Sequence, residues 1–143
     1  MREILFRGKR LQGGDWVEGY FFKSDINKRE RESKKATLIF TPDCDTFIMV
    51  PECHNSFMVV SDTVGQYTGL KDKNGKRIFD GDIAKVLQGK DKDIAYVGFE
   101  NGAFMLYPKT GNIYERTLWS YWYNDWDVEV IGNITDNPEL LEK

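Results

Sequence analysis

Three side chains that could bind a metal or act as nucleophiles lie close together in the sequence, namely Cys44, Cys53 and His54. A structural zinc site needs four ligands, usually in closely spaced Cys or His pairs, and Asp43 or Asp45 would have to complete this set. A Cys–His nucleophile is also disfavoured, because adjacent residues of a strand point to opposite faces. We therefore predict no metal site and, in a reducing cytosol, two free thiols.

Two pairs of carboxylates, Asp80 with Asp82 and Asp91 with Asp93, have the spacing that places both members on one face of a strand. Such a pair could hold a hard cation. However, Asp is a favoured turn residue beside Gly81, and Asp91–Asp93 is predicted to be a polar connection before a strand. The glycine-rich segments also lack the spacing of a phosphate-binding loop. We predict no catalytic residues, no cofactor and a protein that is not an enzyme.

Five aromatic rings lie within eight residues near the C-terminus, at Trp119, Tyr121, Trp122, Tyr123 and Trp126. Their spacing fits one face of a helix as well as the alternation of a strand, and the sequence does not decide between the two. Such a cluster packs a core or forms the centre of a protein interface. The binding hypothesis assigns four of these rings to a protein partner or a second copy of the chain: Trp119, Tyr121, Trp122 and Trp126. Acidic residues would form the polar rim: Asp125, Asp127, Glu129, Asp136, Glu139 and Glu142.

An alternative interpretation is nucleic-acid binding through two basic segments. One is the loop Lys23–Lys35, and the other is a hairpin that carries Lys71, Lys73, Lys76 and Arg77. Basic loops beside aromatic rings are typical of barrels that bind single strands. The chain nevertheless has 20 basic and 23 acidic residues, a net charge of −3, which disfavours a broad phosphate-binding surface.

The elements that must position these residues are short apolar runs rich in Val, Ile, Phe, Tyr and Thr, separated by Gly, Asn and Asp, a pattern typical of β-strands. Close spacing and tight turns favour a small barrel over an open sheet. The predicted strands are Glu3–Arg7, Trp16–Phe22, Ala36–Thr41, Thr46–Val50, Phe57–Val60, Gly65–Thr68, Asp82–Leu87, Ile94–Phe99, Ala103–Tyr107 and Val128–Ile134.

Three turns can be predicted from their residues. Asn101-Gly102 suits the two positive-φ positions of a type I′ hairpin, and Asn74-Gly75 gives the same signal at a solvated basic tip. Asp80-Gly81-Asp82 should turn the chain into the next strand. Near the C-terminus, Asn137-Pro138 favours a short helix, with Asn137 as its N-cap.

The sequence has neither an apolar run of eighteen residues nor the uninterrupted apolar segment of a signal peptide. Charged residues flank the first apolar run on both sides. We therefore expect a cytoplasmic protein with no membrane contact.

The run VGQYTGLKDKNGKRIFDGDI at 64–83 resembles the hallmark of the YopX family of phage and prophage proteins. Residues 2–7 resemble the opening strand of that family, and residues 130–134 followed by 137–141 resemble its closing segment. The resemblance spans nearly the whole chain, although Lys23–Lys35 and Cys44–Phe57 match no part of the pattern.

This resemblance implies a mainly β protein with a small SH3-type β-barrel, encoded by a phage or prophage and acting in the cytoplasm of the bacterial host. We expect an N-terminal β region at 1–62, the SH3-like barrel at 63–135 and a short helical tail at 136–143. The family supplies no activity or catalytic residue to transfer, and the fold alone would not specify one.

Overall fold

The computed structural model describes residues 1–24, 45–114 and 116–142. The predicted strand Ala36–Thr41, Cys44 and nearly all of the basic loop Lys23–Lys35 lie outside the described residues. The chain forms two compact units, one of Glu3–Gln66 and one built mainly from Tyr67–Lys143.

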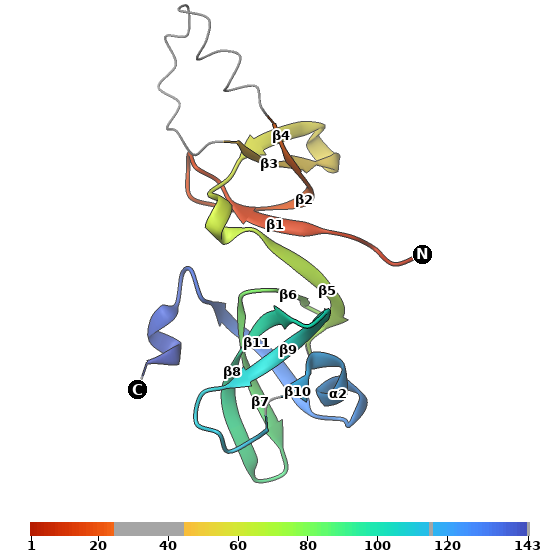
Figure 1. Cartoon of the computed structure of the whole chain (residues 1–143), viewed down its shortest axis with the longest axis vertical. Helices are drawn as coiled ribbons and strands as arrows, with labels where there is room; N and C mark the ends of the chain where they lie inside the picture. Colours follow the sequence, from red (N-terminus) through yellow and green to blue (C-terminus); the bar gives the residue numbers. More distant parts are fainter. Residues whose placement is uncertain (25–44, 115, 143) are drawn as a thin grey trace, which may run out of the picture. The chain divides into compact units, whose positions relative to one another are not determined.

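The N-terminal unit is an antiparallel sheet in which each strand pairs with its neighbour in sequence. Its strands, drawn in red to yellow in Figure 1, are β1 (Phe6–Lys9), β2 (Trp16–Lys23), β3 (Thr46–Val50) and β4 (Asn55–Met58). Two short 3-10 helices, η1 (Pro51–Cys53) and η2 (Ser61–Thr63), precede and follow β4. Leu5, Ile48 and Val59 are buried and form the apolar core of this unit.

Strands β2 and β3 approach each other very closely at Gly19. A Cβ atom at Gly19 would lie 2.0 Å from the backbone oxygen of Met49. The neighbouring pair, Tyr20 opposite Met49, begins the β2–β3 ladder. The approach therefore requires the missing side chain of glycine at this position.

The C-terminal unit contains a five-stranded antiparallel sheet with the strand order β10-β9-β8-β7-β11. Strand β5 (Gly65–Lys71) leads into this unit and pairs with β6 (Arg77–Phe79). The other elements are β7 (Asp82–Gln88), β8 (Asp91–Glu100), β9 (Ala103–Pro108), β10 (Arg116–Thr117), α2 (Leu118–Tyr123), β11 (Asp127–Asn133) and η3 (Pro138–Leu141).

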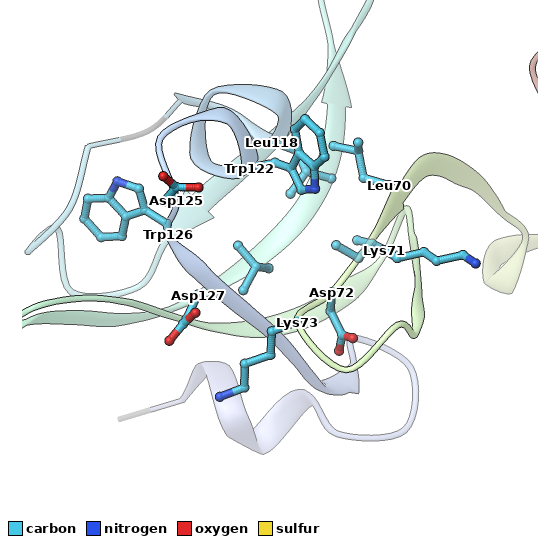
Figure 2. Close-up of a pocket in the computed structure, with 11 residues that line it drawn as sticks. Leu70, Lys71, Asp72, Lys73, Leu118, Trp122, Asp125, Trp126 and Asp127 are labelled. Carbon is cyan, nitrogen blue, oxygen red and sulfur yellow. The ribbon is translucent and has the colours of Figure 1, made fainter.

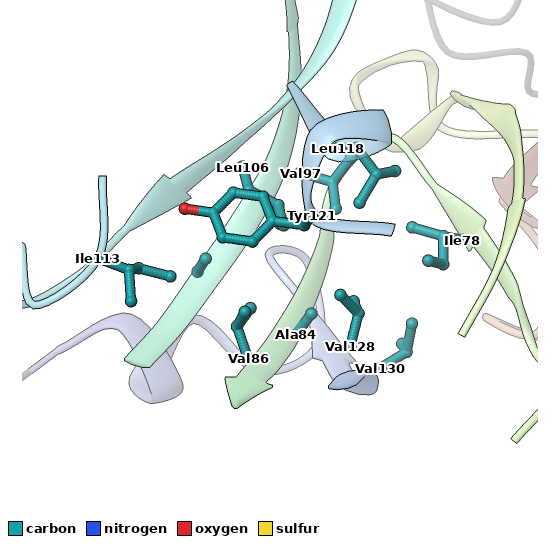
Figure 3. Packing of buried hydrophobic residues seen from close by; sticks show 11 residues of the cluster. Ile78, Ala84, Val86, Val97, Leu106, Ile113, Leu118, Tyr121, Val128 and Val130 are labelled. Atoms are coloured by element: carbon teal, nitrogen blue, oxygen red, sulfur yellow. The ribbon is translucent and has the colours of Figure 1, made fainter. Parts of the chain in front are cut away.

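One face of this sheet and the helix α2 enclose the apolar core of the C-terminal unit, shown in Figure 3. Alternate residues of the strands point into it, as a pleated strand requires. The buried cluster consists of Ile78, Ala84, Val86, Ala95, Val97, Leu106, Ile113, Leu118, Tyr121, Val128 and Val130.

The prediction of a mainly β chain is confirmed, and nine of the predicted strands overlap observed ones. The sequence missed β6 and β10, which have three and two residues, because so short a segment has no measurable periodicity. Among the residues that the structure describes, no closed barrel is found, so the SH3-type barrel stays a prediction. None of the helices in the described ranges has the length and apolar character needed to cross a membrane.

The turn predictions have mixed outcomes. Asn101 and Gly102 both have positive φ, 50° and 80°, which confirms the type I′ hairpin. The Asn74-Gly75 prediction is wrong, because only Gly75 has positive φ, and its N–H donates to the Asp72 carbonyl across a four-residue turn.

The short helix predicted near the C-terminus is found at the predicted place, but the predicted N-cap is wrong. The segment Pro138–Leu141 is a 3-10 helix, and the side chain of Asn137 does not cap it. Instead, the Asn137 side-chain oxygen accepts a hydrogen bond from the Asn133 backbone N–H at 3.3 Å. This contact ties the tail back to the end of β11.

Candidate functional site

The aromatic segment forms the helix α2, which is bounded at both ends by side-chain and backbone hydrogen bonds. The Thr117 hydroxyl accepts from the Ser120 N–H at 3.3 Å and so caps the first turn. At the other end, Asn124 donates to the Ser120 carbonyl from both its backbone and its side chain. Asp125 then takes a left-handed φ of 54° and ends the helix.

The helix sorts its aromatic rings onto different faces. Tyr121 lies on the buried side. Trp119 and Tyr123, four residues apart, stack on each other with ring centroids 5.0 Å apart and are 57% and 65% exposed. Trp122 is 54% exposed. The helical interpretation of this segment is therefore correct, and it brings three exposed rings onto one short element.

The structure divides the four predicted partner-binding residues between core and surface. Tyr121 is only 2% exposed, its hydroxyl donates to the Tyr114 carbonyl, and its ring meets Trp126 edge-on at 5.2 Å. Burial raises the pKa of Tyr121 above its ordinary value. Trp126 is half-buried and packs against the same core. Tyr121 therefore serves packing, and the exposed rings of Trp119 and Trp122 are available for contact.

A hollow of about 240 Å³ lies beside Trp122, as Figure 2 shows. Its apolar lining comes from Leu70, Ile78, Leu118, Val128 and the two tryptophans. Its polar lining consists of Lys71, Asp72, Lys73, Asp125 and Asp127. The hollow thus joins the turn between β5 and β6 to α2 and the start of β11.

The turn that forms one wall of the hollow is fastened to β11 through Asp72. This carboxylate accepts from the N–H groups of Asn74 and Lys76 at 2.9 Å each and from that of Val130 at 3.0 Å. Burial alone would raise the pKa of Asp72, but these hydrogen bonds and the nearby Lys76 charge hold it below its ordinary value. The Lys73 N–H also donates to the Val128 carbonyl.

The predicted acidic rim is only partly assembled at this site. Asp125 and Asp127 line the hollow and are exposed. Glu129 forms an ion pair with Lys73, with 3.1 Å between the Nζ and Oε2 atoms. Asp136 instead accepts from the Asn133 side chain, within the tail.

The basic hairpin of the alternative interpretation does not present its four charges together. Lys73 is paired with Glu129, and Lys76 lies close enough to lower the pKa of Asp72. The Arg77 guanidinium lies over the Tyr67 ring at 5.7 Å from its centroid. Lys71 and Lys76 are exposed, so the described part of this surface offers a weaker phosphate-binding patch than the sequence indicated.

The paired carboxylates occupy structural positions. Asp82 accepts from the Phe79 N–H at 2.7 Å and starts β7 after Gly81, as the predicted turn requires. The prediction of a polar connection at 91–93 is wrong, because these residues begin β8. Asp93 is buried and accepts from the N–H groups of Ile94, Thr110 and Asn112 and from the Thr110 hydroxyl, so it organises the loop after β9.

Hydrogen bonds also hold the pKa of Asp93 below its ordinary value of 3.8, although burial alone would raise it. A folded-state pKa below that of the unfolded chain stabilises the fold above the unfolded pKa, and this stabilisation is lost as the pH falls through the folded pKa. The free energy of unfolding, measured in urea, should therefore be flat between about pH 7 and 5 and fall below about pH 4.

The Asp93→Asn variant isolates this contribution. It should have a lower free energy of unfolding than the wild type at pH 7, and the difference between the two proteins should become smaller as the pH falls. Parallel curves for the two proteins across the acid range would show that Asp93 is not a source of the pH dependence.

The candidate metal and nucleophile residues are not assembled in the described part of the chain. No group of three or more His, Cys, Asp and Glu residues that could hold a metal ion occurs in 1–24, 45–114 and 116–142. Cys53 is exposed and ends η1, and His54 follows it with a left-handed φ of 53°. Both residues therefore lie outside the strands β3 and β4.

Sequence reasoning missed the residues that make the hollow a site. Leu70 and Asp72 lie far from α2 in sequence, and no local pattern connects them to it. The start of α2 could have been predicted from the sequence, because Thr117 is a favoured N-cap residue and stands directly before Leu118 and Trp119.

Comparison with known proteins gives two findings. The family described as YopX protein matches residues 5–142. Among solved structures, the crystal structure of protein EF1440 from Enterococcus faecalis is similar, with a TM-score of 0.52 and 22% sequence identity over 99% of this chain and 100% of that one. At this identity the likeness concerns the fold alone. No protein with a curated function matches the sequence significantly.

Proposed function

The chain belongs to the YopX protein family, whose match spans residues 5–142, and from this premise we propose that it is a non-enzymatic protein-interaction module that binds through α2 and the hollow beside it. Trp122 lies at the centre of the proposed interface, with Trp119 and Tyr123 next to it. The occupant is another protein, and a second copy of the chain is one such partner.

The observation that carries this proposal is the exposure of three large rings on a helix whose other side is firmly packed. Trp119, Trp122 and Tyr123 are each more than half exposed. Clustered exposed aromatic rings are typical of interaction sites, and tryptophan and tyrosine contribute strongly to the binding energy of known interfaces. Trp122 also borders a concave surface with both apolar and charged lining, the usual anatomy of an interface core and rim.

The proposal includes three elements taken from the family resemblance. The protein is encoded by a phage or prophage, it acts in the cytoplasm of the bacterial host, and its C-terminal unit is an SH3-type barrel. The antiparallel order β10-β9-β8-β7-β11 and the β5–β6 hairpin supply strands from which such a barrel can be built. A crystal structure of the C-terminal unit would show whether the sheet closes.

Replacing Trp122 with Ala tests the interface. Because the ring is 54% exposed, its loss should change the free energy of unfolding by less than about 1 kcal/mol. Partner affinity should fall at least about tenfold, as at interface hot spots. Sedimentation over a concentration series would measure self-association, and affinity capture from nuclease-treated host lysate would measure partner binding.

The matched control is Phe99→Ala, which removes a ring that is 57% exposed at the tip of the β8–β9 hairpin. This variant should keep wild-type association. If Trp122→Ala associates as the wild type does, or if the wild type neither self-associates nor retains a protein, the proposal fails.

Nucleic-acid binding through Lys71, Lys73, Lys76 and Arg77 stays the alternative prediction. It requires that affinity for single-stranded DNA fall steeply with salt and that charge reversal at Lys71 and Lys76 weaken binding for all sequences. A salt-independent response excludes it.

A further inference from the structure

We propose that the hollow beside Trp122 receives a segment of the partner that presents an arginine or lysine side chain next to an apolar one. This inference rests on the proposed function and specifies the chemistry of the partner. It is drawn from the apolar floor, the exposed indole and the balance of charge around the hollow.

The floor of the hollow is apolar and belongs to the packed core. Leu118, Val128 and Ile78 are buried members of the core cluster that also line the hollow. Leu70 and Trp122 extend this apolar surface to its rim, where Figure 2 shows their side chains close to Leu118. An apolar side chain of a partner would therefore exchange water for apolar contact here.

The charges around the hollow favour a cation. Lys73 is neutralised by its ion pair with Glu129. The remaining charged residues of the lining are the carboxylates of Asp72, Asp125 and Asp127 and the ammonium of Lys71. The Asp72 carboxylate accepts a hydrogen bond from the Val130 backbone N–H, whereas Asp125 and Asp127 are exposed and can contact a ligand. The two exposed carboxylates outnumber the Lys71 ammonium, so a cationic side chain complements this rim better than a carboxylate does.

Trp122 adds a second attraction for the same ligand. An exposed indole attracts an ammonium or guanidinium group placed over its face, more strongly than tyrosine or phenylalanine does. Trp122 lines the same hollow as Asp125 and Asp127, so one cation could meet the ring and a carboxylate together. Arginine suits this arrangement particularly well, because its planar guanidinium can stack on a ring and pair with a carboxylate.

The backbone at Asp125 is held by the end of the helix. Asp125 holds a left-handed φ of 54°, and the following Trp126 N–H donates to the Tyr121 carbonyl. Non-glycine residues in this conformation are uncommon, although Asp and Asn tolerate it better than other side chains. The end of the helix therefore fixes the backbone from which the Asp125 side chain extends.

The test uses the full chain labelled with nitrogen-15 and three capped tripeptides, acetyl-Leu-Arg-Leu-amide and its Gln and Glu counterparts. The Arg peptide should shift the Trp122 indole signal and the amides of Asp125–Val128, and it should bind at least about fivefold more tightly than the Gln peptide. The double variant Asp125→Asn/Asp127→Asn should weaken binding of the Arg peptide more than binding of the Gln peptide and so reduce this preference. Asparagine also tolerates the left-handed backbone, so the helix end is preserved.

The outcomes separate this inference from the proposed function. Equal or tighter binding of the Glu peptide, an unchanged preference in the double variant, or no binding of any peptide overturns the inference. The interface proposal then stands or falls separately, on whether Trp122→Ala loses partner capture or self-association.

Discussion

The Tyr121→Ala variant should lose about 4 kcal/mol of unfolding free energy, the usual result of removing a large aromatic side chain from a core. Tyr121 is 2% exposed and lies among Leu118, Val97 and Leu106 in the core of the C-terminal unit. Natural domains have only about 5–15 kcal/mol of stability in total. The midpoint of thermal unfolding, measured by circular dichroism, should therefore fall by roughly 15 °C or more.

Two further variants distinguish packing from surface function in the same helix. Tyr121→Phe keeps the ring but removes the hydroxyl that donates to the Tyr114 carbonyl, so it should cost only about 1 kcal/mol. Trp122→Ala should unfold nearly as the wild type does. If Tyr121→Ala is as stable as Trp122→Ala, the division of α2 into a buried and an exposed side is wrong.

The Gly19→Ala variant should destabilise the N-terminal unit by about 3 kcal/mol, at the upper end of the usual cost of overpacking. The added methyl group would lie 2.0 Å from the Met49 carbonyl oxygen and 3.2 Å from the Ile48 side chain. Backbone cannot yield as a flexible side chain can, so β2 and β3 must separate. Urea unfolding, followed through the NMR amide signals of residues 3–23 and 45–66, would measure the loss of unfolding free energy in this unit.

Ser56→Ala is the control for this prediction. Ser56 is exposed on β4 and pairs with Met49 from the other side of β3. Its substitution should change the unfolding free energy by less than about 0.5 kcal/mol. A Gly19→Ala protein with the wild-type urea midpoint would contradict the close approach of β2 and β3.

Local patterns were sufficient to predict most strands and the β8–β9 hairpin. Strands such as β7 and β9 are short apolar runs that contain β-branched or aromatic residues. Asn101-Gly102 fixes the turn because both residues accept positive φ. The same reasoning failed at Asn74-Gly75, where the Asp72 carboxylate accepts from two N–H groups within the turn and from the Val130 N–H of β11. A dipeptide cannot encode a contact that is 58 residues away in sequence.

The candidate site was predicted only in part, for a related reason. The cluster of rings identified α2 as a binding candidate, but Tyr121 and Trp122 are neighbouring large aromatic residues with opposite burial. Which of the two is buried depends on which face of the element meets the core, and the sequence left both helix and strand open. The wall formed by Leu70 and Asp72 depends on how the β5–β6 turn is bonded to β11, which only the tertiary structure shows.

The fastening of the β5–β6 turn to β11 has a consequence for kinetics. Asp72 and Lys73 form hydrogen bonds with the backbone of Val130 and Val128. The turn therefore cannot move away from β11 without breaking these hydrogen bonds. The proposed recognition surface would therefore be preorganised, and most of the ordering entropy of association would fall on the bound segment of the partner. Variation among natural partners should then change residence time far more than the rate of encounter.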